Sequence, residues 1–154
     1  MRPKSPLIVP IMLFVLVTLA TPSASRALTG PGVIRITQRH VGGGFVDIGL
    51  RGPSIGDVQV LRELLYNTNI TPNPIGHAEL TCTYTGTTSR NCSGTFFLPR
   101  GKIVVSGPVL YRQFFELAVV GGTGFYSNVR GTLTVTSLRS GRRASDLLLF
   151  RLVP

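Results

Sequence analysis

The sequence has no tryptophan, two histidines, two cysteines, and 6 acidic side chains against 16 basic ones. Without tryptophan, and without a stretch in which aromatic residues alternate with lysine or arginine, it lacks the surface on which proteins stack single-stranded nucleic acid. His40 and His77 have no other histidine, cysteine or carboxylate at a metal-ligand spacing, so they are interpreted as loop or strand-end residues. The composition therefore predicts neither a nucleic-acid partner nor a metal site.

Long apolar runs are also scarce, and the one at residues 7–20 stands near the N-terminus. Two basic residues precede it, and small residues follow it up to Ala27, which is the layout of a secretory signal peptide. We expect cleavage to remove residues 1–27 and leave a domain of residues 28–154. An uncleaved membrane anchor is the alternative, which Pro10 and the shortness of the run disfavour. No cysteine near the cut offers a lipid anchor. The prediction is an extracellular or periplasmic protein with no stable membrane anchor.

The excess of basic residues is not organised as a binding surface. Removing the three basic residues of the leader from the 16 in the chain leaves 13 against 6 acidic residues, a net charge of +7. Most of these 13 are scattered singly, and a cluster occurs only at Arg139, Arg142 and Arg143. That cluster is interpreted as a solvated loop, with a patch for anionic polymers or lipid headgroups as the alternative.

Short apolar segments bounded by glycine, proline, asparagine or serine recur along the rest of the chain. The segment 57–66 has helically spaced leucines, but its valine-rich start favours a strand. Short strands at this spacing indicate an antiparallel sandwich or a closed barrel. The eight predicted strands are Val33–Val41, Asp57–Tyr66, His77–Thr85, Cys92–Leu98, Lys102–Gly107, Phe114–Val120, Gly131–Leu138 and Asp146–Leu152.

The two cysteines lie on either side of a turn-rich run, residues 85–90. A hairpin folded about Thr87 places Cys82 directly opposite Cys92, close enough for a disulfide. Because an exported chain matures where disulfides persist, we expect the bond to form. A disulfide would exclude catalysis by a Cys82 thiolate; a free thiol, the alternative, would make Cys82 a candidate site residue.

The glycine-rich stretch 119–135 raises the question of a nucleotide site. Gly122 and Gly124 are followed by Ser127, which breaks the G-x-G-x-x-G spacing, and the chain continues as a strand-like GTLTV. The sequence also lacks the GK[ST] of a phosphate loop. The glycines are therefore interpreted as a tight turn between two strands, where positive φ angles are needed.

The segment LAVVGGTGFYSNVRG, residues 117–131, resembles the signature of the allene oxide cyclase and dirigent barrels. Gly56-Asp57 opening a strand, Ile75-Gly76 six residues before Cys82, and the segment Gly101–Pro108 match in the same order. The resemblance covers most of the proposed mature chain. It implies an all-β, eight-stranded antiparallel closed barrel, commonly a homotrimer. Such a barrel encloses an apolar cavity and acts on small hydrophobic molecules by cyclisation or stereoselective coupling. No metal or organic cofactor is implied.

The resemblance also suggests site residues, with departures from the pattern of the plant allene oxide cyclases. Cys82 matches their interior cysteine, whereas Glu63 stands at the place of an asparagine and Glu116 at that of a tyrosine; the first strand offers Gln38 or Arg39 in place of a glutamate. The plant substrate is therefore not expected. With the period of two of a strand, Glu63 and Glu116 are expected to point inward as acid/base residues, since desolvation raises a carboxyl pKa. The expected ligand-binding residues are Leu61, Leu80, Tyr84, Phe96, Leu98 and Phe114.

Three functional classes stay open on this evidence. The first is a barrel that binds a small apolar molecule, and the second is a cyclase or isomerase that uses an interior carboxylate and holds its substrate in one conformation. The third is a structural or interaction protein. Its barrel is filled by its own side chains, and its function lies in its basic surface. In that case each glutamate is paired with an arginine or faces water. An interior cavity and turnover distinguish the three classes.

Overall fold

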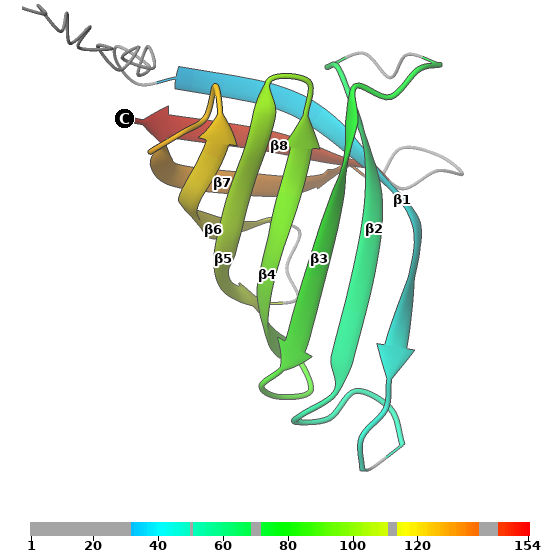
Figure 1. Cartoon of the computed structure of the whole chain (residues 1–154). Helices are drawn as coiled ribbons and strands as arrows, with labels where there is room; N and C mark the ends of the chain where they lie inside the picture. The colour runs from blue at the N-terminus through cyan, green and yellow to red at the C-terminus, as the bar shows by residue number, and fades with distance from the viewer. Residues whose placement is uncertain (1–31, 50, 69–71, 111–113, 139–144) are drawn as a thin grey trace, which may run out of the picture.

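The computed structural model describes residues 32–49, 51–68, 72–110, 114–138 and 145–154. Its strands form a closed antiparallel barrel in chain order, in which β8 returns to pair with β1 (Figure 1). The strands are β1 (Gly32–Val46), β2 (Val58–Tyr66), β3 (Gly76–Tyr84), β4 (Ser89–Leu98), β5 (Gly101–Leu110), β6 (Phe114–Gly124), β7 (Arg130–Leu138) and β8 (Ser145–Val153). The prediction of an all-β, eight-stranded barrel is confirmed.

The long strand β1 closes the barrel. Its first half pairs with β8 from Gly32 to Gln38, and its second half pairs with β2 from Thr37 to Val46 (Figure 1). Between His40 and Gly42 the register with β2 shifts, so that an extra residue interrupts the ladder. Such a bulge bends a strand and redirects its side chains. β1 therefore contributes to two walls of the barrel and runs past the point where β8 begins.

The β3–β4 hairpin has the register expected from the cysteines. Cys82 pairs with Cys92, and the two form a disulfide. The helical alternative for residues 57–66 is wrong, because Val58–Tyr66 forms β2 and pairs with a strand on each side. Its side chains obey the period of two, with Glu63 and Leu65 buried. A strand satisfies the backbone groups of this segment within the barrel, where an isolated helix would not close the wall.

The glycine-rich stretch forms a hairpin, as expected. β6 continues to Gly124, where φ is +63°, and a turn leads to β7. Gly122 serves a different purpose: a Cβ there would lie 2.3 Å from the Tyr126 carbonyl oxygen and 2.6 Å from that of Lys102. The close approach of three backbone segments thus requires glycine at this position.

A core of aliphatic and aromatic side chains fills the part of the barrel where β1 begins and β8 ends. Phe96 and Phe150 meet edge to face, with ring centroids 5.2 Å apart. Leu133 and Leu148 are also fully buried there. Full burial of each such side chain stabilises the fold by roughly 1.5–3 kcal/mol. The dense packing in this part of the barrel leaves interior space beside it.

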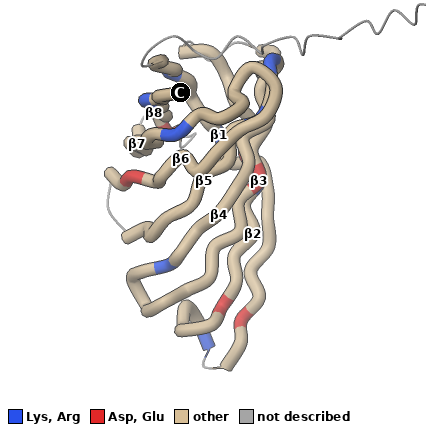
Figure 2. Tube along the Cα trace, turned by 60° about the vertical axis from the view of Figure 1, so that its left-hand side comes forward, with Lys and Arg blue, Asp and Glu red and all other residues tan. Residues whose placement is uncertain are grey.

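The charged residues of the described strands are spread singly along the trace (Figure 2). The basic cluster at Arg139, Arg142 and Arg143 and the expected signal peptide, residues 1–27, lie outside the described residues. Among the residues that the structure describes, no helix is long and apolar enough to cross a membrane.

Candidate functional site

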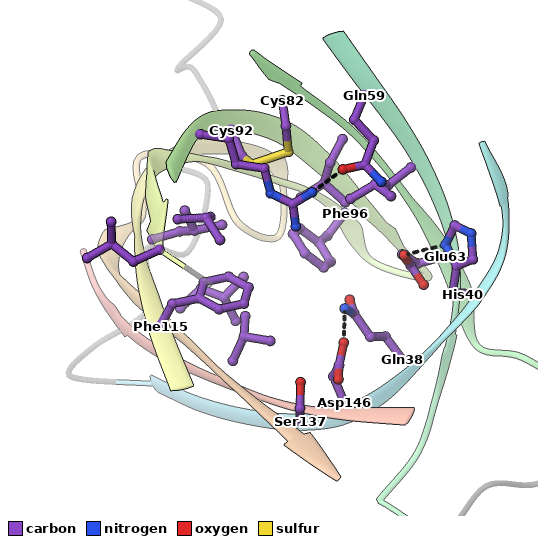
Figure 3. Close-up of a pocket in the computed structure, with 18 residues that line it drawn as sticks. Gln38, His40, Gln59, Glu63, Cys82, Cys92, Phe96, Phe115, Ser137 and Asp146 are labelled. Atoms are coloured by element: carbon purple, nitrogen blue, oxygen red, sulfur yellow. Dashed lines mark hydrogen bonds and ion pairs between the residues drawn. A yellow bond between two sulfur atoms is a disulfide. The ribbon is translucent and has the colours of Figure 1, made fainter. Parts of the chain in front are cut away.

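An interior cavity of about 370 Å³ adjoins the packed core, and Phe96 and Leu133 belong to both. Much of its wall is aliphatic or aromatic and includes Phe96 of β4 and Phe115 of β6 (Figure 3). Polar side chains from β1, β2, β4, β7 and β8 interrupt this wall near the mouth. A small apolar molecule bearing a few polar atoms matches this combination, which is typical of ligand sites.

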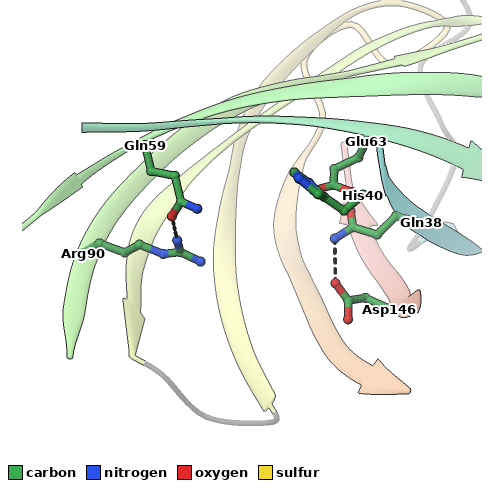
Figure 4. Close-up of polar contacts among 6 residues, drawn as sticks. All are labelled: Gln38, His40, Gln59, Glu63, Arg90 and Asp146. Atoms are coloured by element: carbon green, nitrogen blue, oxygen red, sulfur yellow. Dashed lines mark hydrogen bonds and ion pairs between the residues drawn. The ribbon is translucent and has the colours of Figure 1, made fainter. Parts of the chain in front are cut away.

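Glu63 is the buried carboxylate of the cavity. Its side chain is 7% exposed, and its Oε1 lies 3.0 Å from Nδ1 of His40, whose side chain is 55% exposed (Figures 3 and 4). The two residues are register partners on β1 and β2, directly beside the β1 bulge. Burial raises the pKa of Glu63 above its usual value, against the lowering effect of the hydrogen bond and charge of His40.

A second polar pair lies beside the first. Nε2 of Gln38 donates a hydrogen bond of 3.0 Å to Oδ2 of Asp146, and these residues are register partners on β1 and β8. Figures 3 and 4 show both pairs on the same side of the cavity. The charge of Asp146 contributes to the raised pKa of Glu63. Two carboxylates at one wall thus favour retention of a proton on Glu63.

A third polar group lies apart from these pairs, nearer the start of β2 (Figure 4). Oε1 of Gln59 accepts hydrogen bonds from Nη1 of Arg90 and, at 3.2 Å, from the hydroxyl of Tyr84. The guanidinium carbon of Arg90 also lies 6.0 Å from the centroid of the Tyr84 ring. A positive charge is therefore held at the cavity, apart from Glu63 along the wall.

The expectation that Glu116 and Phe114 point into the barrel is wrong. Phe114 is 54% exposed and Glu116 is exposed, whereas Phe115 and Leu117 line the cavity. The Glu116 carboxylate accepts a hydrogen bond of 2.9 Å from the hydroxyl of Thr134 on the outer face. Because the period is two, a shift of one residue exchanges the faces, and burying the apolar set on β6 keeps the carboxylate in water.

The other residues expected to bind ligand fall into two groups. Leu61, Leu80 and Phe96 line the cavity. Tyr84 is buried and reaches the cavity through its bond to Gln59, and Leu98 packs against the core. Their roles in ligand binding remain predictions.

Both cysteines line the cavity as a disulfide (Figure 3). The prediction that Cys82 and Cys92 are oxidised to one another is confirmed, and no free cysteine occurs in the described part of the chain. The bond removes the thiolate that nucleophilic catalysis by Cys82 would need. Its role here is to join β3 to β4 in the wall.

Sequence reasoning did not find the contribution of His40, which had been interpreted as a loop or strand-end residue. Only the pairing of β1 with β2 brings it to Glu63. Arg90 could have been found, since it lies two residues before Cys92 and shares its inward face by the period of two. Within the described ranges, no three histidine, cysteine or carboxylate side chains cluster as metal ligands would.

No protein-family model and no curated protein matches this sequence. Solved structures match over most of the chain. A pyocyanin demethylase is 22% identical, with a TM-score of 0.68 over 79% of this chain and 100% of its own. A pterocarpan synthase dirigent protein is 15% identical, with a TM-score of 0.65 over 88% and 98% of the two chains. An exo-specific intermolecular Diels-Alderase is 13% identical, with a TM-score of 0.62 over 80% and 98%. The chain has the allene oxide cyclase and dirigent-like barrel fold, as its sequence motifs predict.

Proposed function

We propose that the barrel binds a small hydrophobic molecule in its interior cavity and catalyses its isomerisation or cyclisation by acid/base chemistry. The observation that carries the proposal is Glu63, a carboxyl group buried in an apolar wall at the cavity and bonded to His40. A raised pKa brings a carboxyl group closer to the operating pH, where it can both give and take a proton. Among solved structures with this fold are a Diels-Alderase and dirigent proteins.

In the proposed reaction Glu63 is the catalytic acid and base, and His40 supports it. Glu63 takes a proton from one atom of the substrate and returns a proton to another, so that no oxidant or reductant is consumed. His40 is more exposed than Glu63 and bonds to it, which places a proton carrier between the buried carboxyl and water. The enzyme thus returns to its starting protonation state after each turnover.

The apolar wall of the cavity makes the second contribution to the proposed catalysis. Side chains such as Phe96 and Phe115 hold the substrate in one folded conformation, which lowers the entropy lost on reaching the transition state. A ring closure whose ends are already aligned needs little further catalysis. Orientation by the wall and proton transfer by Glu63 are separable, because they rest on different residues.

The alternative is a non-catalytic interaction barrel with a basic surface. A cavity of about 370 Å³ favours the classes that need an interior ligand over a barrel filled by its own side chains. Binding without turnover, as a scaffold that orients a reactive molecule, is the second candidate, favoured by the dirigent proteins among the structural neighbours. We also propose export after removal of residues 1–27, which the disulfide supports, and assembly as a homotrimer.

The test starts from protein purified from its source. Native mass spectrometry detects and identifies a small molecule that remains bound, and chromatography follows its conversion by fresh protein. Glu63→Gln should keep the fold and the binding of that molecule while lowering turnover by roughly two to four orders of magnitude. Glu116→Gln is the matched control, since it changes an exposed carboxylate outside the cavity. Full turnover by folded Glu63→Gln protein would contradict the carboxylate mechanism, and binding with no conversion by wild type would favour the scaffold.

A further inference from the structure

The cavity wall carries opposite charges at separate places. The carboxyl groups of Glu63 and Asp146 lie on one side, where they bond to His40 and Gln38 (Figure 4). The guanidinium group of Arg90, on β4, lies apart from them and contacts Gln59, which is on β2 four residues before Glu63. Neither the acid/base mechanism nor the apolar wall uses Arg90, so its place in the cavity calls for a separate explanation.

The neighbours of Arg90 keep its charge in an apolar setting. Its register partners are Tyr84 on β3 and Val109 on β5, which are both at most 4% exposed. Gln59 accepts one of its N–H groups. Arg90 is itself half-buried, and near a protein surface the attraction between a cation and an anion is still several times that in bulk water.

The position of Arg90 is fixed by more than one contact. Gln59 accepts a hydrogen bond from the Tyr84 hydroxyl as well as from Arg90, and the Tyr84 ring lies under the guanidinium. A guanidinium held in one orientation presents its N–H donors in a planar fork, which matches the oxygen pairs of carboxylates and related anions. Orientation before binding reduces the entropy lost when the anion arrives.

We propose that the ligand of the interior site is a monoanionic hydrophobic molecule whose anionic oxygen group binds Arg90. This inference rests on the proposed function of that site. The apolar body of the ligand lies against Phe96 and Phe115 and brings the reacting atoms toward Glu63. One negative charge is preferred over two, because a second anionic group elsewhere in the cavity would come close to Asp146 and Glu63. The geometry assigns Arg90 as the residue that selects the ligand and sets its direction in the cavity.

The test uses two dyes that share one aromatic framework, neutral N-phenylnaphthylamine and anionic anilinonaphthalenesulfonate. Each is titrated into the folded protein, and fluorescence gives the two dissociation constants. Wild type should bind the sulfonate more tightly than the neutral dye. Arg90→Gln should lower the preference for the sulfonate by roughly tenfold or more, because it removes one charge-assisted contact, and Arg90→Lys should lower it less. Arg35→Gln, which removes an exposed arginine of β1, is the matched control and should leave the preference unchanged.

The outcomes separate this inference from the proposed function. If neither dye binds and no small molecule accompanies the protein from its source, the interior site itself fails. If the neutral dye binds and Phe96→Ala weakens it, the site holds. An equal affinity for the two dyes, or the same preference in wild type and Arg90→Gln, would then overturn the role of Arg90. A loss of preference in Arg35→Gln would also overturn it, since the sulfonate would be binding at the surface.

Discussion

At the scale of single residues, Glu63 shows how a wall of apolar side chains changes a carboxyl group. Desolvation raises its pKa, while the hydrogen bond and charge of His40 lower it. The folded protein therefore keeps the Glu63 proton to a higher pH than the unfolded chain does. The stability that this group contributes is present at low pH and is lost as pH rises from the ordinary glutamate pKa through the raised one.

We expect nuclear magnetic resonance titration of the Glu63 side chain to give a pKa above the usual range. His40→Phe should raise that pKa further, since it removes both influences that lower it. Denaturant unfolding between acidic and neutral pH should show Glu63→Gln gaining stability relative to wild type as pH rises. Glu79, which lies in an exposed ion pair with Arg62, provides the control as Glu79→Gln. A Glu63 pKa at or below the ordinary value would contradict this account.

At the scale of elements, the β6–β7 hairpin depends more on Gly122 than on the adjacent Gly121. A methyl group at Gly122 would approach two carbonyl oxygens to 2.3 and 2.6 Å, whereas one at Gly121 would meet nothing within 4 Å. Gly122→Ala should lower the free energy of unfolding by about 1–3 kcal/mol, because the hairpin must shift to relieve the overlap. Gly121→Ala should change it by less than about 0.5 kcal/mol. Urea unfolding of both variants checks the difference, and equal stabilities would refute it.

The loop between β1 and β2 is held by a buried carboxylate at its end. Asp57 accepts hydrogen bonds from the amides of Ile48 and Ser54, both at 2.6 Å, and from the Ser54 hydroxyl at 3.1 Å. The backbone hydrogen bond from Ile48, followed by those from Ser54, lowers the Asp57 pKa against the effect of burial. This stabilisation is present above the ordinary aspartate pKa and is lost as pH falls through the lowered one.

Asp57→Asn should therefore loosen the loop, because the amide group of asparagine replaces one of the two accepting oxygens. Hydrogen exchange at the amides of Ile48 and Ser54 should become faster in the variant. Asp47→Asn is the control: Asp47 is exposed and accepts a bond from Gly52 in the same loop, so the change should be smaller. Unchanged exchange at Ile48 in Asp57→Asn would show that the loop is held by other contacts.

At the scale of the whole molecule, the disulfide restricts the unfolded chain more than it shapes the barrel. Cys82 and Cys92 are already register partners in the hairpin and are 10 residues apart in sequence. Closing a loop of this length stabilises a fold by about 2–3 kcal/mol. Wild type should lose this amount in urea unfolding when reductant is added, whereas Cys82→Ala/Cys92→Ala should not respond to reductant. Two free thiols in unfolded, unreduced wild type would contradict the bond.

The N-terminal boundary is a property of the whole chain that the sequence alone predicts. Small residues up to Ala27 fit the cleavage site of an exported protein, so the mature chain should begin at or near Leu28. N-terminal sequencing of the secreted protein measures this directly. Recovery of intact Met1 in a membrane fraction would show that the apolar run anchors the chain instead.

The closed barrel was implied by the family resemblance, whereas the short strands and the cysteine pairing were predicted from the residues themselves. These follow from local rules: a strand shows its faces through a period of two, and the turn about Thr87 sets the register that places Cys82 opposite Cys92. The inward position of Glu63 followed from the same period. On β6 the period of two predicted the wrong face for Glu116. Alternation shows that neighbouring side chains point to opposite faces, but it does not say which face is inside the barrel. The burial of Leu117 in the structure shows that Glu116 faces out.

Only the tertiary structure decided which residues meet in the cavity. His40 and Glu63 are 23 positions apart, and Gln38 and Asp146 are 108 apart, so no local spacing connects them. Barrel closure joins β1 to both β2 and β8, and the bulge in β1 lies directly beside His40. The pKa of Glu63 likewise depends on the burial and charges that this closure brings together. The side chains are present in the sequence, but their chemistry arises from the distances between strands, which packing of the whole barrel sets.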